Sequence, residues 1–257
     1  MPWLANLRDQ IPGAAWLSEK ALGLAKERSL PTWHPAFKLK PTTNDGSRPV
    51  VVLLADTFNR YFEPANLEAA CKVLTHLGYQ VIEAKAHDSD RPVCCGRTFL
   101  AAGLIDQAKK EAARFVEAVL PWVREGYPVV GLEPSCLLTL RDEFLALLPG
   151  ADSALLAEHA FMFEEFLEKE LEAERIKPQF KAHSDQKILV HGHCHQKAAR
   201  VMGPVEAILR RIPGANVEVI QTSCCGMAGH FGYQKETINE SKAMAELTLL
   251  PAIRSAD

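Results

Sequence analysis

Two pairs of adjacent cysteines, each followed by glycine, are the residues of this sequence best suited to chemistry: Cys94-Cys95-Gly96 and Cys224-Cys225-Gly226. Neighbouring side chains of an extended chain point to opposite faces, so both thiols of a pair reach one partner only where the chain turns. Glycine allows such a turn with little strain. A partner that bonds two adjacent thiols needs more than one bonding atom. The pairs therefore indicate a multi-centre ligand.

The total cysteine content points to the same chemistry. The chain has 7 cysteines, an odd number and too few for a disulfide scaffold in a protein of 257 residues. In a cytoplasmic protein this content favours metal ligation or redox chemistry.

A further cysteine, Cys136, lies in the loop Glu133-Pro134-Ser135-Cys136 after an apolar run at residues 129–132. That run is typical of a buried strand. Open α/β sheets bind ligands at the carboxyl ends of their strands. Cys136 is therefore a candidate ligand beside the first cysteine pair.

Cys194 occupies the equivalent place in the second half, in His191-Gly192-His193-Cys194-His195 after a predicted strand at residues 188–190. Imidazole binds iron or zinc, so His191, His193 and His195 are possible additional ligands. The alternative interpretation is that each is a loop histidine bonded to the backbone.

The elements that must position these residues follow an α/β pattern. Residues 50–54 are a continuous β-branched and apolar run, as in a strand buried on both faces of a parallel sheet. A helix is predicted over 64–78, from Pro64 to Gly78. The remaining predicted elements are a strand at 79–84, a helix at 103–125, the strands at 129–132 and 188–190, a helix at 205–211, a strand at 217–220 and a helix at 236–253.

The order of elements in the second half repeats that of the first. We therefore predict an α/β fold with an internal duplication: two pseudo-repeated halves, each a small parallel sheet flanked by helices. Residues 1–47, interrupted by prolines, are interpreted as an irregular arm with a short helix at 16–27. Residues 48–150 form the first repeat, 151–186 a helical connector and 187–257 the second repeat.

The two repeats have complementary gaps in their cysteines. Cys194 follows the first strand of the second repeat, whereas the first repeat has Asp56-Thr57 at that place. A thiol as far beyond Cys225 as Cys136 is beyond Cys95 would lie past residue 257. We therefore expect the second repeat to be truncated.

Composition favours a globular, soluble, cytoplasmic protein. The sequence is 47% hydrophobic and 24% charged, with a net charge of -3, and it has no basic stripe, so nucleic acid is not expected as a partner. No apolar run reaches about 18 residues, and the N-terminus lacks a basic segment followed by an apolar stretch. We expect neither a transmembrane segment nor a secretory signal.

Four longer motifs together resemble a known family: Ala55-Asp56-Thr57-Phe58-Asn59-Arg60-Tyr61, Gly131-Leu132-Glu133-Pro134-Ser135-Cys136, His191-Gly192-His193-Cys194-His195 and Cys224-Cys225-Gly226-Met227-Ala228-Gly229. Their arrangement is similar to the cysteine-rich CCG domain of the heterodisulfide reductase B subunit and of glycolate oxidase iron-sulfur subunits. The resemblance covers about residues 49–257. More specifically, the motifs resemble the C-terminal iron-sulfur region of fused FAD-linked 2-hydroxy acid oxidases.

The resemblance implies a set of metal ligands and two departures from the family pattern. The implied ligands are Cys94, Cys95, Cys136, Cys194, Cys224 and Cys225. Thr57 stands where the family has a first-repeat cysteine, and Thr139 stands at the second cysteine of a family CxxC motif. The cofactor implied is an iron-sulfur cluster, of the 4Fe-4S type.

The function implied by the resemblance is electron transfer in an FAD-linked oxidoreductase acting on D-lactate, glycolate, 2-hydroxyglutarate or a similar acid. FAD and the substrate site would belong to a partner domain or subunit, and the electrons would go to an acceptor such as a quinone. The chain itself is expected to have no catalytic residue. It would be cytoplasmic and peripheral to the inner membrane through its partner.

Two other functions stay open. A structural zinc site takes four ligands, commonly from separate hooks, whereas adjacent thiolates can bond different irons of one cluster, which favours iron-sulfur over zinc. The chain could still be a metal-poor or zinc-binding docking or scaffold module, or a thiol-disulfide redox protein of the heterodisulfide reductase type. Cys71 is left out of the site because it lies on the apolar face of a predicted helix, where free cysteine behaves as a small buried hydrophobe.

Overall fold

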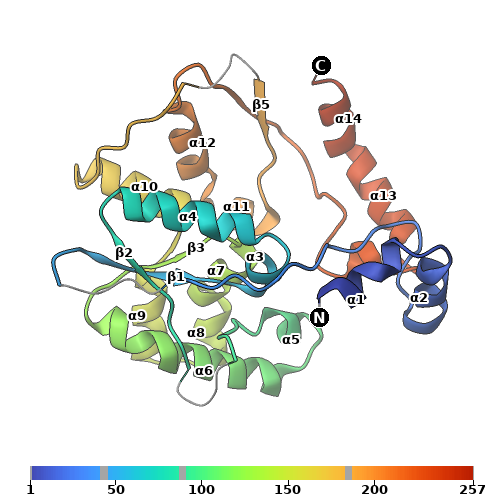
Figure 1. Cartoon of the computed structure of the whole chain (residues 1–257), viewed down its shortest axis with the longest axis horizontal. Coiled ribbons are helices and arrows are strands. Elements are labelled where there is room, and N and C mark those ends of the chain that lie inside the picture. Colours follow the sequence, from blue (N-terminus) through green and yellow to red (C-terminus); the bar gives the residue numbers. More distant parts are fainter. Residues whose placement is uncertain (1, 41–45, 87–90, 183–186, 257) are drawn as a thin grey trace. The chain divides into compact units, whose positions relative to one another are not determined.

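A computed structural model describes residues 2–40, 46–86, 91–182 and 187–256 (Figure 1). The chain divides into two compact units. The first, which we call the sheet unit, comprises Ala36–Phe180 and His195–Ile208. The second, the arm unit, comprises Met1–Pro35, Lys181–Cys194 and Leu209–Asp257.

The described part of the sheet unit is built on a four-stranded parallel sheet in the order β2-β1-β3-β4. Its strands are β1 (Val50–Leu54), β2 (Gln80–Ile82), β3 (Val129–Gly131) and β4 (Ala160–Met162). Every residue of β1 is buried, as expected for an inner strand covered on both faces.

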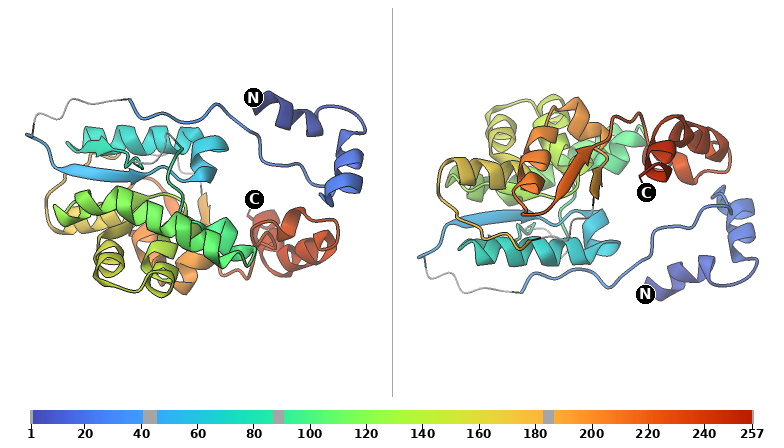
Figure 2. Two further views of the ribbon diagram at one scale, coloured as in Figure 1. Left: turned by 90° about the horizontal axis from the view of Figure 1, so that it is seen from below. Right: turned by 90° about the horizontal axis from the view of Figure 1, so that it is seen from above.

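Helices cover both faces of this sheet (Figures 1 and 2). The side chains of β1 alternate between two hydrophobic cores. Val51 and Leu53 belong to one core, together with side chains of α4 (Pro64–His76) and α10 (Phe163–Glu172). Val52 and Leu54 belong to the other core. Its side chains come also from α6 (Ile105–Arg124), α7 (Pro134–Arg141), α8 (Glu143–Leu147) and α9 (Ala151–His159). The short helices α3 (Thr57–Tyr61) and α5 (Arg97–Ala101) follow β1 and the first cysteine pair.

The predicted α/β class with parallel sheets is confirmed, and the structure adds a strand that we did not expect. Within the segment predicted as a helical connector, 151–186, residues 160–162 form β4 between α9 and α10 and pair with β3. A run of three residues between two helices has no periodicity of its own, so the helical pattern around it hid the strand. Residues 183–186 lie outside the described residues.

The arm unit contains a second parallel pair of strands, β5 (Lys187–Val190) and β6 (Asn216–Val219). The helix predicted over 236–253 is divided at Thr248 into α13 (Ile238–Leu247) and α14 (Leu249–Arg254). The remaining elements are α1 (Pro2–Asn6), η1 (Leu7–Asp9), α2 (Ala14–Leu22) and η2 (Phe231–Tyr233). Two further helices, α11 (Cys194–Ala198) and α12 (Met202–Arg210), each span a boundary between the units.

The first part of the predicted arm, residues 1–35, is joined to the second repeat. Leu24 and Gln234 form an antiparallel bridge. On either side of it the Ala25 amide donates to the Tyr233 carbonyl at 2.7 Å, and the Lys235 amide donates to the Gly23 carbonyl at 2.8 Å. The arm therefore pairs with the loop that follows Cys224-Cys225-Gly226.

Among the described residues, no helix is both long and apolar enough to cross a membrane.

The glycine after each cysteine pair holds its turn against a helix. Gly96 and Gly226 have φ values of 74° and 80°, in the left-handed region that favours glycine. A methyl group on Gly96 would lie 3.0 Å from the carbonyl oxygen of Ala108 in α6. A methyl group on Gly226 would lie only 2.1 Å from the carbonyl oxygen of Ser241 in α13. Glycine is therefore required at these turns both for conformation and for space.

Gly226→Ala should destabilise the protein more than Gly229→Ala. Gly229 has a similar φ of 65°, but no atom lies within 4 Å of the place that a methyl group would take, so its substitution adds only conformational strain. Gly226→Ala adds a clash with α13. We expect the free energy of unfolding to fall by about 1–3 kcal/mol more for Gly226→Ala, the usual effect of overpacking. Urea unfolding of both variants measures it. Equal losses would mean that the turn is not packed on α13.

Candidate metal centres

The topology of the sheet unit gathers the predicted residues of the first repeat at one edge. Thr57 follows β1, Cys94 and Cys95 lie beyond β2, and Cys136 follows β3. These three strands are neighbours and run parallel, so their carboxyl ends lie at the same edge of the sheet. Ligands of open α/β sheets bind at this edge.

The thiols at this edge contact one another in series. Cys94 and Cys95 lie close enough to affect each other's pKa, and so do Cys95 and Cys136. Thr57, at the other end of the series, lies close enough to Cys94 to lower the pKa of its thiol. Cys95 and Cys136 are only 3% and 4% exposed, and Cys94 is half-buried. The structure thus brings together the predicted first-repeat ligands and places Thr57 beside them.

Capping side chains fix where the helices that carry these residues begin. Asp56 accepts from the amides of Phe58 and Asn59 at 2.9 and 3.0 Å, so α3 starts at Thr57. Glu133 accepts from the Ser135 amide at 3.1 Å and the Ser135 hydroxyl at 2.7 Å, so α7 starts just before Cys136. Burial raises the pKa of Asp56, while its hydrogen bonds to Asn59 act in the opposite direction.

Burial and mutual hydrogen bonding keep these thiols protonated in the metal-free chain. The hydrogen bond with Cys95 and burial raise the pKa of Cys94, and the hydrogen bond with Cys136, together with burial, raises the pKa of Cys95. For Cys136 the hydrogen bond with Cys95 lowers the pKa, but burial and nearby acidic groups outweigh it. Because the thiolate is the metal ligand, binding at this site must release protons.

Backbone amides point at the sulfurs in both repeats, in the same way. The Gly96 amide donates to Cys94 Sγ at 3.4 Å, and the Gly226 amide donates to Cys224 Sγ at 3.3 Å. The Arg97 amide donates to Cys95 in addition. Donors of this kind stabilise negative charge on sulfur, so thiols with these amide partners fit the donor set of an iron-sulfur cluster.

The predicted ligands of the second repeat lie at the corresponding edge of the arm unit. Cys194 follows β5, and Cys224 and Cys225 follow β6, the parallel neighbour of β5. Cys194 is exposed, and the pair is half-buried.

Within the described ranges of both units, no three His, Cys, Asp or Glu side chains are grouped to hold a single metal ion.

The candidate histidines take part in hydrogen bonds with side chains. His191 Nδ1 and Thr222 Oγ1 are 2.5 Å apart. In the sheet unit, Arg97 Nη2 lies 2.9 Å from His195 Nε2, and since a guanidinium only donates, this ring nitrogen accepts. Burial and the Arg97 charge lower the pKa of His195, which keeps its ring neutral. In this arrangement a metal would bond to Nε2 of His191 or to Nδ1 of His195, because the other nitrogen of each ring is in the hydrogen bond. His193 is half-buried in the same loop.

Cys71, which we excluded from the site, packs against the core on the α4 face of the sheet. Burial, assisted by Glu83 and Glu68, raises its pKa to about 11. Cys71 is half-buried, so it packs as a small apolar side chain at the margin of this core.

Two arginines near the cysteine pairs were not singled out from the sequence. Arg97 forms an ion pair with Glu143 besides its contact with His195. Its position directly after Cys94-Cys95-Gly96 is the signal that could have identified it. Arg28 contacts the loop after the second pair from a position 199 residues away from Met227, and nothing in the local sequence indicates that contact.

Comparison with known proteins shows what parts of this chain are similar to. Residues 188–251 match the family model described as "CCG: Cysteine-rich domain". The chain is 27% identical over 248 residues to the C subunit of the anaerobic glycerol-3-phosphate dehydrogenase of Escherichia coli strain K12, a match that covers 94% of this chain and 60% of that protein. No solved structure matches the chain significantly.

The chain is also similar to dehydrogenases named for 2-hydroxyglutarate. It is 24% identical over 230 residues to D-2-hydroxyglutarate dehydrogenase of Pantoea ananatis, covering 86% of this chain and 21% of that protein. It is 26% identical over 215 residues to the D-2-hydroxyglutarate dehydrogenase of Pseudomonas putida, covering 82% and 19%. The chain thus spans less than two thirds of each of these relatives. The family model thus matches residues 188–251 of the 49–257 over which the motifs resemble the CCG domain, and the chain as a whole is similar to these dehydrogenase proteins.

Proposed function

We propose that this chain is the iron-sulfur electron-transfer module of an FAD-linked oxidoreductase that acts on a D-2-hydroxy acid of the lactate, glycolate or 2-hydroxyglutarate type. The observation that carries the proposal is that Cys94, Cys95 and Cys136 come together at the ends of adjacent parallel strands, close enough to affect one another's pKa. Thiols arranged in series suit a ligand that contains several metal atoms. The relatives support an oxidoreductase through their names, which are those of dehydrogenases.

The proposed ligands form one group in each unit. Cys94, Cys95 and Cys136 would hold a cluster in the sheet unit, and Cys194, Cys224 and Cys225 one in the arm unit, both of the 4Fe-4S type. A cluster bound by thiolates supplies one-electron transfer without transfer of atoms.

The other residues around the cysteines act on charge and position. The amides of Gly96 and Gly226 stabilise charge on sulfur, and the caps of α3 and α7 hold Thr57 and Cys136 in place. We assign the flavin and the oxidation of the hydroxy acid to a partner domain or subunit, and the final acceptance of electrons to a molecule such as a quinone.

Thiol-disulfide exchange is a second candidate, favoured by the contact between the Cys95 and Cys136 thiols. In that reaction a small-molecule disulfide would accept two electrons, the two sulfurs would bond, and two protons would leave. Metal and thiol analysis separates the two functions. Iron with inorganic sulfide supports the first, whereas reversible loss of two thiols from a metal-free chain supports the second.

Iron incorporation should depend on Cys224 and not on Cys71. After anaerobic reconstitution we expect Cys224→Ser to lose most of the iron and sulfide of the arm-unit centre. The substitution removes a sulfur ligand that accepts a hydrogen bond from the Gly226 amide. Cys71→Ser is the matched control, since Cys71 packs on the core. Iron and sulfide per chain and the visible absorption band are measured. An equal loss from both variants would show that the ligand assignment is wrong.

Adding a thiol at Thr57 should strengthen the sheet-unit centre. Thr57 lies close enough to Cys94 to lower the pKa of that thiol, so Thr57→Cys places a fourth thiol beside the series. In a Cys224→Ser background, which weakens the other centre, we expect about a twofold rise in iron retained per chain, because metal binding gains with each suitable ligand. Thr57→Ser keeps the hydroxyl and should leave iron unchanged. If Thr57→Cys retains no more iron than Thr57→Ser, the fourth ligand position lies elsewhere.

A further inference from the structure

The N-terminal arm places a guanidinium on the loop that follows the second cysteine pair. Arg28 Nη1 lies 2.7 Å from Met227 Sδ, 2.7 Å from the Gly232 carbonyl oxygen and 2.9 Å from Ser241 Oγ. All of these groups belong to the arm unit. One side chain of the arm therefore connects the start of the loop, its end and helix α13.

The loop is shaped to receive this side chain. A methyl group on Gly232 would lie 2.6 Å from Arg28 Nη1, so glycine at this position leaves the space that the guanidinium occupies. Ser241 is fully buried, and its backbone is also the surface on which Gly226 packs. Arg28 and Gly226 thus hold the loop against the same residue of α13.

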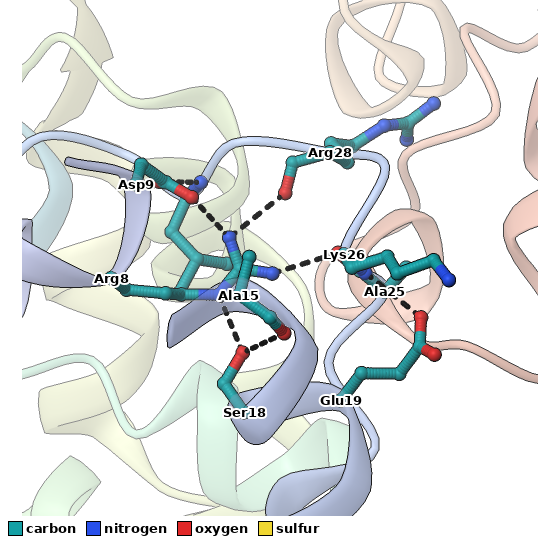
Figure 3. Close-up of polar contacts among 9 residues, drawn as sticks. Arg8, Asp9, Ala15, Ser18, Glu19, Ala25, Lys26 and Arg28 are labelled. Atoms are coloured by element: carbon teal, nitrogen blue, oxygen red, sulfur yellow. Dashed lines mark hydrogen bonds and ion pairs between the residues drawn. The ribbon is translucent and has the colours of Figure 1, made fainter. Parts of the chain in front are cut away.

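The arm holds the Arg28 backbone independently of the loop (Figure 3). Arg8, which is 9% exposed, donates to the carbonyl oxygens of Arg28 and Ala25 at 3.2 and 2.8 Å and to Ser18 Oγ at 2.8 Å. In Figure 3 the side chain of Arg28 points away from this cluster. The pairing of residues 23–25 with residues 233–235 fixes the approach of the arm further.

The charge of Arg28 has a consequence for the centre. Arginine stays protonated in proteins, so its positive charge is permanent. Met227, which it contacts, is separated from Cys225 only by Gly226. A fixed positive charge close to thiolate ligands offsets their negative charge and favours the more reduced, more negative state of whatever they bind.

We propose that Arg28 is a positioning residue of the Cys224-Cys225 centre, and that the N-terminal arm is a structural part of this centre. The proposal rests on the iron-sulfur function proposed above. Arg28 holds the ligand loop in shape through Met227, Gly232 and Ser241, and its charge raises the reduction potential of the bound cluster.

The test compares substitutions in the full chain after anaerobic reconstitution. Arg28→Gln removes the charge and should release iron to a chelator about tenfold faster, as loss of supporting contacts around a metal site typically does, and lower the midpoint potential. Ser241→Ala keeps the charge but removes an acceptor of Arg28, so it should speed iron release and leave the potential unchanged. Arg28→Lys should restore the potential.

Glu27→Gln is the matched control. Glu27 neighbours Arg28 in the arm, and its carboxylate forms an exposed ion pair with Lys242 of α13. This variant should release iron at the unsubstituted rate. Chelator kinetics and a redox titration followed by electron paramagnetic resonance give both quantities.

The outcomes separate this proposal from the function on which it rests. A reconstituted unsubstituted chain without iron would overturn the proposed function. An iron-loaded chain in which Arg28→Gln and Ser241→Ala release iron no faster than Glu27→Gln would overturn only the role of Arg28. If Arg28→Gln does not fold, Ser241→Ala alone decides the positioning role, and a rate of iron release equal to that of Glu27→Gln contradicts the proposal.

Discussion

The structure depends on one constraint: adjacent parallel strands end at the same edge of their sheet. The chain leaving β1 reaches Thr57 at once, and the chain leaving β3 reaches Cys136 at the start of α7. The chain beyond β2 brings Cys94 and Cys95 to the same place. Parallel strands need crossover connections, so α4 joins β1 to β2 and α6 joins β2 to β3. These two helices contribute to the cores on opposite faces of β1. Residues distant in sequence thereby come into hydrogen-bond contact.

The parts of this arrangement that could be predicted have a local signal. The five residues of β1 are apolar and mostly β-branched, and a run of this kind indicates a strand buried on both faces. Each cysteine pair followed by glycine indicates a turn, and both glycines have the left-handed conformation that such a turn requires. Cys136 could be placed at a sheet edge because an apolar strand precedes it directly.

The parts that could not be predicted depend on contacts between distant segments. β4 is three residues long and owes its conformation to pairing with β3, so the sequence of 160–162 contains no periodic signal for it. The contacts of Arg28 with the loop after Cys225 join residues about 200 positions apart. The pairing of the arm with residues 233–235 and the space that Gly232 leaves for Arg28 likewise join segments that are distant in the sequence.

The two cysteine-glycine turns are alike, but their surroundings differ. In the sheet unit, Cys95 and Cys136 are buried, and both thiols would have to lose a proton before a metal could bind. Thr57 stands there in the place of a thiol. In the arm unit, Cys194 is exposed, the pair is half-buried, and a guanidinium is fixed on the adjoining loop. The same cysteine-glycine turn therefore stands among buried thiols in one unit and beside an exposed thiol and a fixed positive charge in the other. The two proposed ligand groups differ in burial and in charge, although the turns that carry them are alike.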